Sequence, residues 1–196
     1  MWMYFIKGGP IMWPLLVCSI GALTIAIERL FYHRSIRVNH AVMRRLLETF
    51  RAGDVVAAAN LAEKLAPPFR VVFVEGVRQA ASPQLADLLE DIADQQVPQL
   101  ERFLPLLATI ASVATLLGFT GTVTGMIQAF EAIAAAGSVT PQTVSSGIAQ
   151  ALITTAAGLF IAIPTIIFYN YFVYRADRYV QTLEHYLHEF LKARPS

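Results

Sequence analysis

Residues 147–158 have the sequence Gly147-Ile148-Ala149-Gln150-Ala151-Leu152-Ile153-Thr154-Thr155-Ala156-Ala157-Gly158. They belong to a longer stretch, from Ala132 to Tyr174, in which no residue carries a formal charge. Such a stretch can cross a bilayer as a helix, because a span needs ~20 predominantly apolar residues. A polar side chain such as Gln150 within a span either bonds neighbouring helices together or lines an ion path. These residues leave both alternatives open.

The overall composition is also that of a membrane protein. Of the 196 residues, 56% are hydrophobic and 15% are charged, compared with ~25% charged in soluble domains. The formal net charge is +1, so we expect no nucleic-acid partner. The single cysteine excludes an internal disulfide. We find no motif for catalysis, for a metal ion or for a cofactor, and we predict none of the three.

Three uncharged stretches are long enough to cross a bilayer, namely Pro10–Ile27, Phe103–Phe130 and Gln142–Tyr174. The connection Ala134–Pro141 is short and suits a helical hairpin turn. We therefore predict an all-α membrane protein with three transmembrane helices. The second and third stretches exceed the length that a bilayer needs, so their helices should continue into water.

The distribution of basic residues predicts how the chain is oriented in the membrane. Ten Lys or Arg residues lie between Arg29 and Arg102, and none lies in the connection Ala134–Pro141. The positive-inside rule then places the N-terminus and the hairpin turn in the periplasm and the C-terminus in the cytoplasm. The predicted regions are a periplasmic N-terminus with the first span (1–31), a cytoplasmic helical segment (32–102), the pore hairpin (103–174) and a cytoplasmic C-terminal helix (175–196).

Short helices are predicted within the cytoplasmic segment. Apolar residues recur at helical spacing from Val42 to Phe50, before Gly53 interrupts the pattern. Further helices are expected at Val55–Leu65, at Phe69–Ala81 and from Leu85 toward the second span, where Pro98 and Pro105 are expected to kink the chain. The basic tract Arg29–Arg45 is expected to lie against anionic headgroups. The alternative is that it forms salt bridges with Glu48 and Asp54.

Both long spans carry a face of small or small polar residues. On the second span these are Ala111, Thr115, Gly118, Thr122, Gly125 and Ala129. On the third they are Gly147, Gln150, Ala151, Thr154, Thr155, Gly158, Ala162 and Thr165. Small faces let membrane helices approach closely, and we predict helix packing for Gly118, Gly121, Gly125, Gly158 and Pro164. The hydroxyls and the amide favour a narrow lumen lined by Thr115, Thr122, Gln150, Thr154 and Thr155.

Three segments together resemble the MotA/TolQ/ExbB proton channel family, and ExbB and TolQ most of all. The segments are Pro14–Ser19 with Ile27–Leu30, then Leu116-Leu117-Gly118-Phe119-Thr120-Gly121-Thr122-Val123-Thr124-Gly125-Met126, and finally Gly147–Leu152 with Ala162–Pro164 and Tyr169–Asn170. The resemblance implies a pentameric ring around a dimer of single-span partners of the ExbD or TolR type. It also implies that proton flow past a partner carboxylate drives work on TonB, for outer-membrane uptake, or on TolA in the Tol-Pal envelope system.

The resemblance assigns the family's pore threonines to Thr122 and Thr155. The chain departs from the family where Gln150 replaces Glu, Thr115 replaces Pro and Thr120 replaces Leu. Glutamine keeps the hydrogen bonding of glutamate but cannot exchange a proton. Three alternatives stay open: an ExbB-type channel subunit of the bacterial inner membrane, a TolQ-type subunit, or a non-conducting scaffold. We expect Gln150 to face the lumen near Thr122, Thr154 and Thr155.

Overall fold

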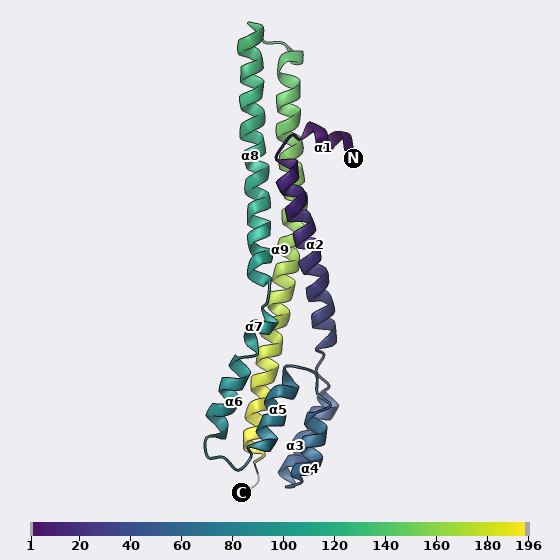
Figure 1. The fold of residues 1–196 in the computed structure, drawn as a ribbon, viewed down its shortest axis with the longest axis vertical. Helices are drawn as coiled ribbons and strands as arrows, with labels where there is room; N and C mark the ends of the chain where they lie inside the picture. The colour runs from purple at the N-terminus through teal and green to yellow at the C-terminus, as the bar shows by residue number, and fades with distance from the viewer. Residues whose placement is uncertain (1, 195–196) are drawn as a thin grey trace. The chain divides into compact units, whose positions relative to one another are not determined.

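The computed structural model describes residues 2–194. Its helices in chain order are α1 (Trp2–Lys7), α2 (Met12–Ser35), α3 (His40–Arg51), α4 (Val55–Ala62), α5 (Phe69–Arg78), α6 (Leu85–Asp94), α7 (Val97–Leu100), α8 (Leu104–Ala136) and α9 (Pro141–Lys192) (Figure 1). Residues 2–194 contain no strand. The predicted all-α fold is therefore confirmed.

The three predicted spans correspond to α2, α8 and α9. Each lies in a helical segment that is long and apolar enough to cross a membrane. The helices extend past the apolar stretches: α2 ends at Ser35 and α8 at Ala136. The third helix is continuous over 52 residues, from Pro141 to Lys192. It thus continues well beyond the uncharged stretch, and its extension into water stays a prediction.

The predicted hairpin turn joins α8 to α9. Gly137 ends α8 in the left-handed conformation, with φ 66°, and donates its N–H to the carbonyl of Ile133. Thr140 and Thr143 then cap α9 reciprocally, because each backbone N–H donates to the other's hydroxyl, at 3.1 and 3.3 Å. Pro141 stands at the first helical position, where a proline costs no hydrogen bond. Figure 1 shows α8 and α9 side by side after this turn.

The chain divides into two compact units. Within the described residues, unit 1 comprises residues 2–28 and 103–171, and unit 2 comprises residues 29–102 and 172–194. In unit 1 the buried residue Leu15 of α2 packs with Ala114 of α8 and Ala162 of α9. Two of the three side chains are alanine, so this contact brings the helices close together.

Unit 2 has the larger hydrophobic core, built around the C-terminal part of α9. Phe190 is fully buried and stacks on Phe50 of α3 with ring centroids 4.2 Å apart. Phe73 of α5 meets the same ring edge-on at 5.5 Å. A Cβ added at Gly76 would lie 2.9 Å from Phe190, so a glycine lets α5 approach. The short helices predicted between Val42 and the second span are confirmed as α3, α4, α5 and α6.

The expected kinks at Pro98 and Pro105 are wrong. Pro98 lies in the first turn of α7 and Pro105 in the first turn of α8. A proline in the first turn removes no intrahelical hydrogen bond, so both residues help to begin helices rather than bend one. Between them, Phe103 has φ 66°, a left-handed value that ends regular helix geometry. The chain therefore approaches α8 through a break and not through a bent helix.

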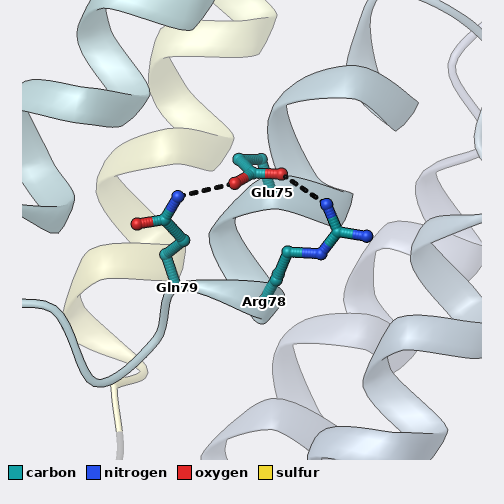
Figure 2. A network of polar contacts seen from close by, with 3 residues as sticks. All are labelled: Glu75, Arg78 and Gln79. Carbon is teal, nitrogen blue, oxygen red and sulfur yellow. Dashed lines mark hydrogen bonds and ion pairs between the residues drawn. The ribbon is translucent and has the colours of Figure 1, made fainter.

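The last turn of α5 carries a local polar network (Figure 2). One carboxylate oxygen of Glu75 accepts from the Gln79 amide at 2.7 Å, and the other pairs with Arg78 at 3.4 Å. Both contacts lie within three or four residues on one helix face. Exposed pairs of this kind contribute little to stability, so the network fixes side-chain orientation more than it holds the fold.

Candidate ion-path site

The small faces of α8 and α9 pack directly against each other. A Cβ added at Gly125 would lie 2.6 Å from the carbonyl oxygen of Gly147, and one at Gly147 would lie 2.5 Å from that of Gly125. A Cβ at Gly158 would lie 2.6 Å from the carbonyl oxygen of Ala114. We call this contact the glycine seam; its glycines are Gly118, Gly121, Gly125, Gly147 and Gly158. At four of these positions an atom of the other helix lies too close for a Cβ, and at Gly118 the nearest atoms would lie 3.3 Å from it.

Thr154 is part of the glycine seam. Its residue is 0% exposed, and its hydroxyl donates to the carbonyls of Gln150 and Ala151 at 2.9 and 3.0 Å. A Cβ added at Gly121 would collide with the Thr154 side chain, which fills the space that this glycine leaves. Thr154 therefore holds α8 and α9 together inside the subunit. Its hydroxyl reaches no surface of unit 1.

Three other threonines follow one edge of the glycine seam. The Thr155 hydroxyl donates across the seam to the carbonyl of Gly118 at 3.0 Å. On α8, the hydroxyls of Thr115 and Thr122 donate to carbonyls of their own helix, those of Ala111 and Phe119. Thr115 and Thr122 are seven residues apart, or about two turns, so they share a face of α8. Thr115 is exposed, and Thr122 and Thr155 are half-buried.

Gln150 lies in a different environment. A Cβ added at Gly9, in the loop between α1 and α2, would lie 2.7 Å from Nε2 of Gln150. The amide is thus packed against the N-terminal loop, where Gly9 has φ +72°. Gln150 and Thr155 are five residues apart, which turns them about 140° from each other around α9. The structure therefore does not bring the Gln150 amide to the threonine edge, and its contact with an ion path stays a prediction.

Pro164 lies within α9 without ending it. The helix is continuous from Pro141 to Lys192 and includes this proline. The next residue, Thr165, is 3% exposed and donates its hydroxyl to the carbonyl of Ile161 at 2.6 Å. This bond satisfies the Thr165 hydroxyl inside the helix, but the carbonyl that Pro164 leaves without a backbone donor is that of Phe160, four residues before it.

The prediction that the basic tract lies against lipid headgroups is wrong for Arg29. The residue is 1% exposed, and its guanidinium donates to the carbonyls of Gln99 and Leu100 at 3.1 and 3.3 Å. It also lies 4.5 Å from the centre of the Tyr32 ring. Arg29 therefore cannot reach headgroups. Its N–H groups satisfy the carbonyls at the end of α7. The distribution of charged residues along the sequence does not reveal this role.

The other arginines of the tract, Arg34, Arg37, Arg44 and Arg45, are exposed. Within residues 2–194, the structure records no ion pair between them and Glu48 or Asp54. Asp54 instead caps α4 by accepting from the N–H of Ala57 at 2.9 Å. The alternative of internal salt bridges is therefore not supported, and lipid contact stays a prediction for these four residues.

Replacing Thr155 with valine is expected to weaken the glycine seam by about 1 kcal/mol, because one interhelical hydrogen bond is lost with little change in volume. Thermal unfolding of the detergent-solubilised protein measures the change. Thr155→Ser keeps the hydroxyl and is the matched control. Equal melting temperatures for the valine and serine variants would show that the bond to Gly118 contributes nothing.

The fold and the seam define the class of the protein. Three helices long and apolar enough to cross a bilayer, two of them packed through the glycine seam, are typical of a multi-pass helical membrane protein. Residues 53–185 match the model of the MotA/TolQ/ExbB proton channel family. The chain belongs to this family, which is a transport family of membrane proteins.

Some of the similar proteins are named ExbB and others are named TolQ. The chain is 35% identical to biopolymer transport protein exbB1 of Vibrio cholerae, over 91% of this chain and 82% of that protein. It is 39% identical to the putative biopolymer transport protein ExbB-like 1 of Synechocystis, over 81% of this chain and 65% of the relative. A 42% identity to the Tol-Pal system protein TolQ of Haemophilus influenzae covers 50% of this chain and 42% of that protein.

Proposed function

We propose that the protein is the ion-conducting subunit of an inner-membrane complex that uses the proton motive force. The observation that carries the proposal is the edge formed by Thr115, Thr122 and Thr155 along the glycine seam, in a chain that belongs to a proton channel family. Thr115 and Thr122 lie in the uncharged stretch Phe103–Phe130, and Thr155 lies in the uncharged stretch Ala132–Tyr174. A charge that moves along them must therefore be carried by a partner or by water.

The proposed complex is a ring of identical subunits, a pentamer, with α8 and α9 innermost. Single-span partners of the ExbD or TolR type occupy the lumen and supply a carboxylate that takes up and releases protons. The long similarity to exbB1 of Vibrio cholerae favours an ExbB-type client, a TonB-like protein that powers outer-membrane uptake. The shorter but higher identity to TolQ supports a TolA-like client as the second candidate.

The proposed orientation has the N-terminus and Ser138 in the periplasm and Ser82 in the cytoplasm. Cys18 is only half-buried, so each reporter cysteine is introduced into a Cys18→Ser background. A membrane-impermeant maleimide added to intact spheroplasts is expected to label Ser138→Cys and to leave Ser82→Cys unlabelled. Labelling of both after membrane disruption is the control. Labelling of Ser82→Cys alone in intact spheroplasts would reverse the orientation.

Reconstituted proton flux tests the function itself. Liposomes that contain the protein with its co-encoded single-span partner should acidify under an imposed potential, whereas the protein alone should not. Thr122→Val with Thr155→Val should reduce this flux about 30-fold, since two hydroxyls of the path are removed, each worth about 1 kcal/mol. Flux that persists unchanged in the double variant would show that the path lies elsewhere. Absence of flux with the partner present would favour the scaffold alternative.

Gln150 is tested in the same liposomes. Because glutamine does not titrate, the pH dependence of flux in the parent should come from the partner carboxylate. Gln150→Glu adds a second titrating group and should change the pH profile if position 150 contacts the path. Gln150→Leu is the comparison that removes the amide. Identical profiles for all three would confine position 150 to packing against Gly9.

A further inference from the structure

A basic cavity lies within unit 2, outside the glycine seam. Its volume is ≈ 460 Å³, within the range of about 300–1,000 Å³ typical of small-ligand sites. The lining residues come from the segment that follows α2 and from one stretch of α9; they are Arg37, Val38, His40, Tyr174, Arg175, Arg178, Tyr179 and Thr182. Three guanidinium groups thus line one cavity, and no carboxylate is among its lining residues.

Arg175 is held in a fixed position at the wall of this cavity. Its Nη2 donates to the Tyr179 hydroxyl at 3.4 Å, and its guanidinium carbon lies 5.7 Å from the centre of that ring. The Tyr179 hydroxyl in turn donates to the carbonyl of His33 at 3.2 Å. Tyr179 is 8% exposed, so this support is itself buried. A guanidinium held in this way loses little freedom when it binds an anion.

Arg37 and Arg178 provide the exposed part of the positive charge. Among residues 2–194, no ion pair is recorded for Arg37 or for Arg178. Neither Arg37 nor Arg178 is neutralised by a carboxylate of unit 2. Guanidinium groups bind phosphate oxygens in pairs of hydrogen bonds, so the cavity suits a phosphate group.

The neighbouring sequence indicates the source of that phosphate. Tyr174 is the last residue of the uncharged stretch of α9, and it is 62% exposed. Phe31, near the end of α2, is 69% exposed. Exposed aromatic residues followed by basic residues at the end of a span are typical of the level of the lipid headgroups. We propose that this cavity binds the phosphodiester headgroup of an anionic phospholipid.

The proposal is tested on the full-length protein in detergent, with dioleoylphosphatidylglycerol as the probe and native mass spectrometry as the readout. Arg37→Ala with Arg178→Ala should weaken binding about 30-fold, which corresponds to about 1 kcal/mol for each charge removed. The matched control is Arg51→Ala with Arg70→Ala, which removes two exposed charges that belong neither to the basic tract nor to the cavity lining. Arg37→Gln with Arg178→Gln repeats the test if the alanine variant is poorly folded, with hydrogen exchange at the Phe190 core as the check.

Loss of phosphatidylglycerol binding only in the Arg37/Arg178 variants would support the proposed lipid site. An equal loss in the Arg51/Arg70 control would mean that lipid binding depends on total charge and not on this cavity, and it would overturn the proposal, as would unchanged binding in every variant. Equal binding of phosphatidylcholine would also overturn it. Displacement of the lipid by millimolar inorganic phosphate would assign the cavity to a soluble phosphate and not to a headgroup.

Discussion

Replacing Gly147 with alanine should destabilise the α8–α9 hairpin by about 3 kcal/mol, the upper part of the range for overpacked sites. The added Cβ would lie 2.5 Å from the carbonyl oxygen of Gly125 and 2.7 Å from the amide nitrogen of Ala129. Both atoms belong to the backbone of α8, which cannot rotate away as a side chain could. The helices must separate, and separation breaks the contacts along the whole glycine seam.

Thermal unfolding in detergent, followed by circular dichroism and by size-exclusion chromatography, measures this loss. Gly21→Ala is the matched control, because it adds the same methyl group on a candidate span. There the only atom near the new Cβ is the end of the Ile110 side chain, at 3.4 Å. The control should unfold close to the parent temperature. If both variants behave like the parent, the glycine seam is looser than the structure indicates.

Replacing Arg29 with leucine should cost about 3–5 kcal/mol, because two hydrogen bonds from a charged group disappear and the Leu100 carbonyl is left buried without this donor. The acceptors are the carbonyls of Gln99 and Leu100 at the end of α7. The residue is 1% exposed, so water cannot replace the guanidinium without opening the structure. Local opening should therefore be greatest around α7.

Hydrogen exchange read by mass spectrometry locates the effect. Peptides that cover Val97–Leu100 should exchange faster in Arg29→Leu than in the parent. Arg29→Lys keeps the charge but lacks the planar guanidinium that donates to both carbonyls. It should therefore show protection between that of Arg29→Leu and that of the parent. Arg34→Leu, at an exposed position on the same helix, is the control for lost charge. Equal protection in the two leucine variants would contradict the buried role of Arg29.

The spans and the hairpin could be predicted because the signals for them are local. Uncharged stretches of bilayer length and a connection that contains Gly137 and Pro141 specify helices and a turn without reference to distant residues. The start of α8 was missed for the opposite reason. Proline occurs both in kinks and in first turns, and only the left-handed backbone of Phe103 distinguishes the two.

The candidate site was predictable as a set of residues but not as an arrangement. Small residues at helical spacing indicate a close contact, yet they do not tell whether it lies within one subunit or between subunits. The structure places Thr154 inside the seam of one subunit, at 0% exposure. Gln150 contacts Gly9, which is far away in the sequence. The spacing of residues within α9 cannot predict this contact.

The direction in which the threonine hydroxyls donate has a consequence for the sign of the permeating ion. The single protons of the Thr115, Thr122 and Thr155 hydroxyls are all given to helix carbonyls. Each oxygen is then left with lone pairs only, since a hydroxyl has one proton to donate. A row of such oxygens along the proposed path offers partial negative charge to whatever passes. It coordinates cations and orients water with its hydrogens toward the wall, and it offers nothing that could replace the hydration of an anion.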